Sequence, residues 1–246
     1  MKFSYIIPTA KPNFCSENVI EGILKLPTHE FEIILISTGE DSFNNIPNFK
    51  FIKDTKKTGS VSAINEGYKQ SSGDIIIITP DDHTVPENFL DIKNYLNSKE
   101  FNSKKIKLGN LCEWMGGPGK DVFYKKLKKL TSGEWHVNTA YPKDHTNQIP
   151  YQIVAFPVLE KATVENELNG VIFNECFLHH YPDHWLGAYS EYINKEDDIG
   201  PKDVFMTCVQ NHNDLQTNFK TDPYDKEVFL KLMNRMKDGI NYNCKI

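Results

Sequence analysis

Residues 73–90 read GDIIIITPDDHTVPENFL, an apolar run that ends on two adjacent aspartates and a histidine. Ile75 to Ile78 are four consecutive β-branched residues, which is typical of a strand buried on both faces in a parallel sheet. Carboxylates at the carboxyl end of such a strand lie where open α/β sheets bind ligands. Because Asp81 and Asp82 repel each other, we expect water, a lysine or a divalent metal that carries a phosphorylated substrate to offset their charge.

The overall composition limits the class of protein. The chain of 246 residues is long enough for one large domain with a full core. A formal net charge of -5 argues against a general nucleic-acid-binding protein. No apolar run is long enough to span a membrane, and the first residues lead directly into a strand, so we expect neither a transmembrane segment nor a signal peptide. Five scattered cysteines without a CxxC motif indicate reduced thiols in a cytoplasmic protein.

Strand and helix patterns alternate through the first part of the chain. This alternation predicts right-handed βαβ units and a parallel sheet with helices on both faces. The expected strands are residues 3–8, 31–37, 49–53 and 75–79, and the expected helices are residues 16–26, 60–70 and 86–98.

The alternation fails in the second part of the chain. We therefore expect a nucleotide-binding type of half, residues 1–105, followed by a smaller mixed half, residues 106–246, that ends in a helix. In this second half the expected strands are residues 106–111 and 151–157, and the expected helices are residues 122–130, 162–168 and 222–237.

Four segments, in order, resemble the GT-A glycosyltransferases, specifically the inverting family 2 type. They are IIPTAKPN (6–13), TGSVSAINEGYKQSSGD (58–74), TPDDHTVPENFL (79–90) and LNGVIFNECFLHHYPDHWLG (168–187). The resemblance implies a single α/β domain of the GT-A fold, with a Rossmann-like, mostly parallel central sheet. It also implies transfer of a sugar from a nucleotide-diphosphate sugar to a hydroxyl of a saccharide or lipid-linked acceptor, with Mn²⁺ or Mg²⁺ as cofactor.

The resemblance gives the adjacent aspartates distinct roles. It implies that Asp82 is a metal ligand and that Asp81 is a partner of the ribose or of a metal-bound water. Mg²⁺ and Mn²⁺ accept one or two hard oxygen ligands together with substrate phosphates, which agrees with this assignment. The alternative is a polar turn in which Asp82 or Thr84 caps the next helix. His83 is a ligand for manganese more readily than for magnesium, or a plain loop residue.

The resemblance places the nucleotide base near the first two strands. Pro8 and Thr9 correspond to the end of the opening strand, where Thr9 would lie against the base. Lys11 stands where the family often has an aromatic residue that stacks on the base. Thr38 stands where the family usually has an aspartate that reads the base edge, and a threonine hydroxyl discriminates less than a carboxylate. The alternative for Thr38 is an ordinary strand-to-turn segment, Ser-Thr-Gly.

The start of the helix at residue 60 is a candidate diphosphate site. Lys57 and Gly59 precede a helix N-terminus, where backbone N–H groups and the helix dipole favour anions. The alternative for Lys57 is a solvated surface lysine. Asn65 occupies the position of the family's helical asparagine, where we expect it to brace the metal-binding loop.

The segment YPDHW carries the expected acceptor site. The resemblance implies that Asp183 is the general base that removes the proton of the acceptor hydroxyl. His180, Tyr181, His184 and Trp185 would form the walls of the sugar pocket. The alternative is that Asp183 caps a helix that begins at His184.

Other readings stay open. The basic amphipathic segment 122–130 favours either association with the inner face of a membrane or an ordinary solvated helix face. His212 is a third metal ligand or a surface histidine. The chain is alternatively a non-catalytic sugar- or nucleotide-binding protein of the same fold. A nucleotidyltransferase would need a glycine-rich loop with arginine after the first strand, and residues 9–12, TAKP, do not form one.

Overall fold

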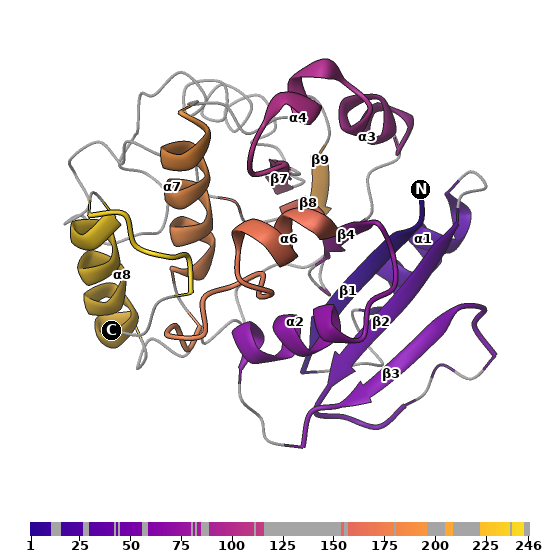
Figure 1. The fold of residues 1–246 in the computed structure, drawn as a ribbon. Helices are drawn as coiled ribbons and strands as arrows, with labels where there is room; N and C mark the ends of the chain where they lie inside the picture. The colour runs from indigo at the N-terminus through magenta and orange to yellow at the C-terminus, as the bar shows by residue number, and fades with distance from the viewer. Residues whose placement is uncertain are drawn as a thin grey trace.

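A six-stranded, mostly parallel sheet forms the centre of the molecule (Figure 1). The structure is a computed structural model that describes residues 1–10, 16–26, 30–41, 43, 45–55, 59–79, 81, 83–84, 89–110, 112–115, 154, 157–179, 181–195, 205–208, 222–236 and 238–243. In spatial order the strands are β3 (Phe49–Lys53), β2 (Phe31–Ser37), β1 (Phe3–Thr9), β4 (Ile75–Ile78), β8 (Pro157–Glu160) and β6 (Leu108–Asn110). The first four strands are parallel to one another, whereas β8 runs antiparallel to both of its neighbours.

The remaining elements surround this sheet. A second, three-stranded sheet consists of β5 (His83–Thr84), β9 (Phe205–Cys208) and β7 (Cys112–Met115). The helices are α1 (Ser16–Lys25), α2 (Ser60–Lys69), α3 (Phe89–Leu96), α4 (Lys99–Ser103), α6 (Lys161–Glu167), α7 (Pro182–Asn194) and α8 (Asp222–Met236). Because the six-stranded sheet takes β1 to β4 from the first half and β6 and β8 from the second, the two predicted halves share one sheet.

The predicted elements of the first half are confirmed to within a few residues. Of the strand expected at residues 151–157, the structure describes only residues 154 and 157, and Pro157 is the first residue of β8. At the first position of a strand, the missing N–H of proline costs no hydrogen bond of the ladder. The helix expected at residues 122–130 lies outside the described residues.

The four isoleucines of β4 supply both cores of the molecule. Ile76 and Ile78 pack in the cluster that contains residues of α2, α7 and α8, whereas Ile75 and Ile77 pack in the cluster on the opposite face with residues of α1 and α3. All four are at most 3% exposed. Side chains of a strand alternate between the two faces of a sheet, so an unbroken apolar run is what a central strand with helices on both faces requires.

Two glycines bring other elements close to the sheet. A Cβ at Gly67 of α2 would lie 2.7 Å from side-chain atoms of both Ile6 and Ile36, so the glycine lets α2 approach β1 and β2. A Cβ at Gly73 would lie 2.5 Å from Ser4 Oγ. The glycines of the segment TGSVSAINEGYKQSSGD at these positions are therefore explained by packing.

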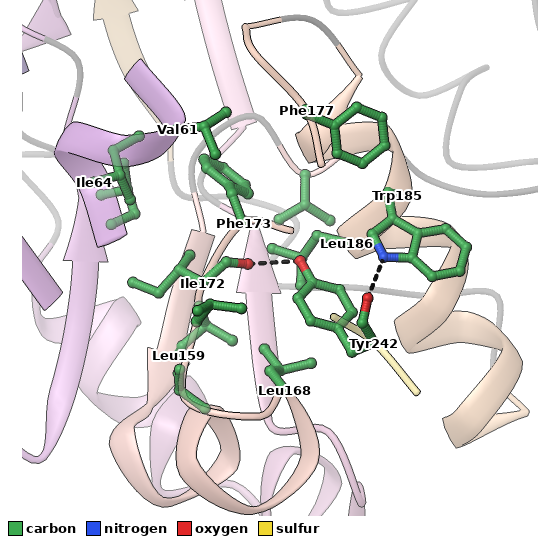
Figure 2. Packing of buried hydrophobic residues seen from close by; sticks show 14 of the residues in the cluster. Val61, Ile64, Leu159, Leu168, Ile172, Phe173, Phe177, Trp185, Leu186 and Tyr242 are labelled. Carbon is green, nitrogen blue, oxygen red and sulfur yellow. Dashed lines mark hydrogen bonds between the residues drawn. The ribbon is translucent and has the colours of Figure 1, made fainter. Parts of the chain in front are cut away.

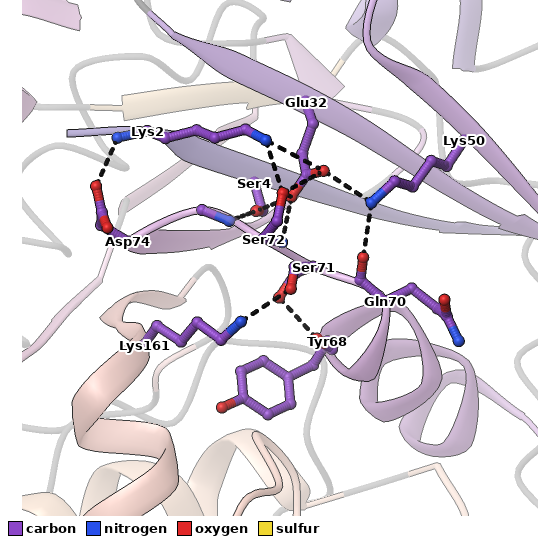
Figure 3. A network of polar contacts seen from close by, with 11 residues as sticks. Lys2, Ser4, Glu32, Lys50, Tyr68, Gln70, Ser71, Ser72, Asp74 and Lys161 are labelled. Carbon is purple, nitrogen blue, oxygen red and sulfur yellow. Dashed lines mark hydrogen bonds and ion pairs between the residues drawn. The ribbon is translucent and has the colours of Figure 1, made fainter.

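A buried carboxylate holds together the amino ends of three strands (Figure 3). Glu32 of β2 is 3% exposed and accepts hydrogen bonds from Ser4 Oγ at 2.6 Å, from Ser72 N at 2.5 Å and from Lys50 Nζ at 3.0 Å. Burial acts to raise the pKa of Glu32, but these hydrogen bonds outweigh it and lower the pKa to about 2. The network lies at the edge of the sheet opposite to the carboxyl ends of the strands.

Candidate functional site

The carboxyl ends of β1 and β4 bring two predicted site residues into contact. Thr9 Oγ1 donates a hydrogen bond of 2.5 Å to Asp81 Oδ2, across 72 residues of sequence. Pro8 is the preceding, half-buried residue of β1. This edge of a parallel sheet is where α/β proteins bind ligands, because the strand ends leave backbone groups and polar side chains open there. The structure therefore places Pro8, Thr9 and Asp81 together at this edge of the sheet.

Thr38 reaches the same edge from β2. Thr9 is opposite Ser37 in the register of β1 and β2, so Thr38 follows directly beside the pair of Thr9 and Asp81. Ser37 Oγ accepts a hydrogen bond from Gly39 N at 3.0 Å, which closes the Ser-Thr-Gly turn that was the alternative interpretation. Thr38 is half-buried at this turn, and its contact with a base stays a prediction.

The N-terminus of α2 contacts the second half of the chain. Gly59 precedes the helix with a φ of 89°, and a Cβ there would lie 2.9 Å from the carbonyl oxygen of Leu178. Both the left-handed backbone and this close approach favour glycine. Ser60 Oγ lies 2.9 Å from His179 Nδ1. Lys57, like Lys11, lies outside the described residues.

Asn65 of α2 is bonded to the backbone of residues 172 and 173. Its Nδ2 donates to Phe173 O at 2.7 Å, and its Oδ1 accepts from Ile172 N at 3.0 Å and from Phe173 N at 3.1 Å. The side chain is 2% exposed. This buried amide therefore joins α2 to the backbone that precedes α7, and its expected role in bracing the metal-binding loop stays a prediction.

Asp183 lies in the first turn of α7 and does not cap it. The N-cap is Tyr181, in a left-handed conformation with a φ of 64°, and Pro182 is the first helical residue. The capping alternative, in which a helix begins at His184, is therefore wrong by two residues. The side chain of Asp183 is half-buried, and none of the hydrogen bonds or ion pairs between described residues involves its carboxylate. A carboxylate in the first turn also interacts favourably with the helix dipole.

The described residues of the predicted aromatic wall are buried in the protein. Trp185 is fully buried, and its Nε1 donates to Tyr242 O at 3.1 Å (Figure 2). Tyr181 and His184 are 6% and 3% exposed, and both pack against Phe229 of α8. A ring that is covered by protein cannot stack on a sugar, so Trp185, Tyr181 and His184 are corrected to core residues. His180 lies outside the described residues.

Sequence reasoning missed the polar residues that hold the backbone of residues 172–179. Asn174 is fully buried and donates from Nδ2 to Tyr242 O at 2.7 Å, and Tyr242 donates from its hydroxyl to Ile172 O at 2.6 Å. Burial raises the pKa of Tyr242 well above its usual value. Asp225 of α8, also fully buried, accepts from the backbone of Leu178 and His179. The sequence offers one signal for Asp225: it is a carboxylate on the same helix face as the apolar residues Val228 and Phe229, which indicates a buried polar role.

The aspartates at the end of β4 have the chemistry of a divalent-metal site. Among the residues that the structure describes, no group of three or more His, Cys, Asp or Glu side chains is arranged to hold a metal ion. Mg²⁺ and Mn²⁺ need only one or two protein carboxylates when phosphates and water complete their shell. Asp81 supplies a hard oxygen at the edge where β1 and β4 end, and a carboxylate there is compatible with a metal-bound water. Asp82, His83 as a side chain and His212 lie outside the described residues.

Over the described part of the chain, none of the helices is both long and apolar enough to cross a lipid bilayer.

Comparison with known proteins identifies the fold. Neither models of protein families nor curated proteins match the sequence. Among solved structures, the chain is similar to residues 1–349 of TarS of S. aureus, with a TM-score of 0.62 at 14% identity over 95% of this chain and 64% of that one. The same TarS segment in complex with UDP-GlcNAc gives a TM-score of 0.61 at 12% identity, over 97% of this chain and 73% of that one.

A mannosyltransferase is equally similar. PcManGT from Pyrobaculum calidifontis, in complex with GDP-Man and Mn²⁺, matches with a TM-score of 0.62 at 15% identity, over 97% of this chain and 65% of that one. The chain thus spans about two thirds of the length of these proteins. At such low identity the likeness shows the fold, and the chain has the mixed α/β fold of these glycosyltransferase structures.

Proposed function

We propose that this chain is a divalent-metal-dependent, inverting glycosyltransferase. It takes a sugar from a nucleotide-diphosphate sugar and transfers it to a hydroxyl of a saccharide or lipid-linked acceptor. The contact of Thr9 with Asp81, at the carboxyl ends of two parallel strands in a glycosyltransferase fold, is the observation that carries the proposal. The two halves, residues 1–105 and 106–246, act as one domain in this proposal, in the cytoplasm or at the inner face of a membrane.

The donor binds at the edge formed by β1, β2 and β4. Pro8, Thr9 and Thr38 lie against the base, and Asp81 meets the ribose or a metal-bound water. Lys11 is available to a phosphate, and the diphosphate lies toward Lys57 and Gly59, because a helix N-terminus with lysines favours anions. Neighbours in complex with UDP-GlcNAc and with GDP-Man support a nucleotide-sugar donor of this kind.

Asp82 would hold Mn²⁺ or Mg²⁺, with Asp81 next to it as a partner of the ribose or of a metal-bound water. When bound, the metal offsets the negative charge that develops on the leaving diphosphate. The neighbouring mannosyltransferase structure contains Mn²⁺, which supports this cofactor for the present chain.

Asp183 acts on the acceptor. The acceptor hydroxyl attacks the anomeric carbon from the face opposite the diphosphate, the carbon–oxygen bond to the diphosphate breaks, and the hydroxyl proton passes to the Asp183 carboxylate. Its half-buried place in the first turn of α7 leaves the carboxylate accessible without a competing partner among the described residues. Glu175, which is exposed on the same segment, is the next candidate for the base.

A donor panel tests the proposal. The purified chain is incubated with UDP-GlcNAc, UDP-glucose, GDP-mannose and other nucleotide sugars, with Mn²⁺ or with EDTA, and release of the nucleoside diphosphate is measured. We expect metal-dependent release from at least one donor. Binding of a donor without release or transfer would favour a non-catalytic sugar-nucleotide-binding protein. Release of pyrophosphate from a nucleoside triphosphate and a sugar phosphate would favour a nucleotidyltransferase.

A further inference from the structure

A buried carboxylate on α8 holds the backbone that leads to the candidate base. Asp225 is fully buried, its Oδ1 accepts from Leu178 N at 2.8 Å, and its Oδ2 accepts from His179 N at 2.9 Å. A buried carboxylate is stable only when hydrogen bonds or charges compensate its lost hydration. Both oxygens of Asp225 therefore fix residues that precede Asp183 by only a few positions.

The next turn of α8 holds the other side of the same segment. Phe229 stacks on Tyr181 with ring centroids 5.6 Å apart and contacts the edge of His184 at 6.0 Å. Residues four apart on a helix share a face, so Asp225 and Phe229 contact the segment together. Asp183 lies between the two residues that Phe229 contacts.

The opposite side of this segment meets the candidate donor site. The carbonyl of Leu178 lies so close to Gly59 that a Cβ there would approach it to 2.9 Å, and the ring of His179 lies 2.9 Å from Ser60 Oγ. Residues 178 and 179 are therefore placed between α8 and the N-terminus of α2. Tyr181, with a φ of 64°, is in a backbone conformation that costs energy for a tyrosine and persists only when its surroundings hold it.

We propose that Asp225 is a positioning residue: by accepting the N–H groups of Leu178 and His179 it sets the place of the Asp183 carboxylate relative to the donor bound at α2. The inference rests on the proposed function, in which Asp183 is the base. Without this carboxylate, the N–H groups of Leu178 and His179 lose a charged acceptor, and the turn before α7 shifts to find other partners for them. A small displacement of a base lowers the rate of the chemical step while donor binding is unaffected.

Asp225→Asn and Glu227→Gln form a matched pair of variants. Asparagine keeps the size of Asp225 but replaces one acceptor oxygen by an amide that faces a backbone N–H. Glu227 is on the same helix, two residues further on, and is exposed. Its carboxylate contacts Lys231 Nζ at 2.7 Å, so its replacement makes the same chemical change at the surface.

The rate is measured with whichever donor the panel identifies, and it is expressed per donor-binding site titrated by calorimetry. Because unfolded protein has no donor-binding site, a smaller folded fraction does not lower the measured kcat. We expect Asp225→Asn to lower kcat by about 10- to 100-fold with donor Kd and KM unchanged, and Glu227→Gln to leave all three unchanged. Hydrogen–deuterium exchange should be faster in Asp225→Asn over the peptide that contains residues 177–185, and only there.

The inference is overturned if Asp225→Asn keeps the wild-type kcat although this peptide exchanges faster. It is also overturned if donor Kd rises by the same factor by which kcat/KM falls, because the defect would then lie in donor binding. If Asp225→Asn does not fold, Phe229→Leu tests the same helix face, and a wild-type kcat in that variant would overturn the inference too. Failure of the proposed function is seen separately, as a wild-type protein that turns over no donor. That result would leave no base to position.

Discussion

Replacing Glu32 by glutamine tests whether the buried carboxylate network stabilises the sheet. Glu32 accepts hydrogen bonds from Ser4, Ser72 and Lys50, and its side chain is 4% exposed. Glutamine has nearly the same shape but keeps one acceptor oxygen and carries no charge. It also presents an amide to donors that now face a carboxylate oxygen. We expect the variant to fold, because the substitution weakens a polar network and leaves the hydrophobic core intact.

The magnitude follows from the pKa of Glu32. Its pKa is lowered from 4.5 to about 2 in the folded protein. Because one pH unit corresponds to about 1.4 kcal/mol, the ionised carboxylate contributes about 3 kcal/mol to the free energy of unfolding. A carboxylate whose pKa is lower in the folded state stabilises the folded protein at pH values above its unfolded-state pKa. The contribution of Glu32 is therefore complete above about pH 5 and is lost as the pH falls toward 2.

The assay is urea unfolding of the wild type and Glu32→Gln between pH 7 and pH 3. At pH 7 we expect the variant to be less stable by about 2–3 kcal/mol. At pH 3 only about 1 kcal/mol of the wild-type contribution remains, so the difference should narrow by about 2 kcal/mol. Taking the difference between the two proteins removes the effect of other groups that titrate in this range.

Glu21→Gln is the control. Glu21 pairs with Lys25 at 3.2 Å, and both side chains are mostly exposed. The loss of this pair should change the free energy of unfolding by less than about 1 kcal/mol at every pH. A Glu32→Gln difference that stays constant from pH 7 to pH 3 would refute the reasoning, because it would show that the ionised form of Glu32 is not the one that the fold favours.

Further predictions address the donor, the base and the packing of α2. Asp82→Ala should abolish the Mn²⁺-dependent part of nucleoside-diphosphate binding in calorimetric titration without lowering the melting temperature; retained metal enhancement contradicts the ligand assignment. Asp183→Asn should lower transfer by about 10²–10⁴-fold at unchanged donor affinity, with little loss of stability, since Asp183 does not cap α7; near-normal turnover would place the base elsewhere. With Thr38 and Lys11 at the base-contacting positions, affinities for uridine, guanosine and thymidine diphosphates should differ by no more than about a hundredfold. Gly67→Ala should lower the free energy of unfolding by about 1–3 kcal/mol, because its Cβ would overlap two buried isoleucines, and a wild-type urea midpoint would show that α2 can move away.

The sequence predicts the elements whose pattern repeats locally. The isoleucines of β4 and the apolar spacing of α2 indicate their structure within a few residues, and the predicted first half is confirmed for this reason. The contact of Thr9 with Asp81 was also predictable, because parallel strands end at the same edge of a sheet. The first residue of β8 is Pro157, and its place between β4 and β6 depends on pairing with strands that are distant in sequence, which no local pattern shows.

By itself, then, the sequence determined a mostly parallel α/β sheet and the edge at which Thr9 and Asp81 meet. Only the tertiary structure decided what Asn65 and the polar and aromatic residues of the second half do. Asn65 and Asp225 bind backbone groups that lie 107 and 47 residues away in sequence, and no local pattern identifies such partners. Tryptophan is a residue type that stacks on sugars, yet Trp185 is buried against Tyr242. The physical reason is that burial depends on which elements pack together, and that is decided by the free energy of the whole chain and not by the residues next to each position.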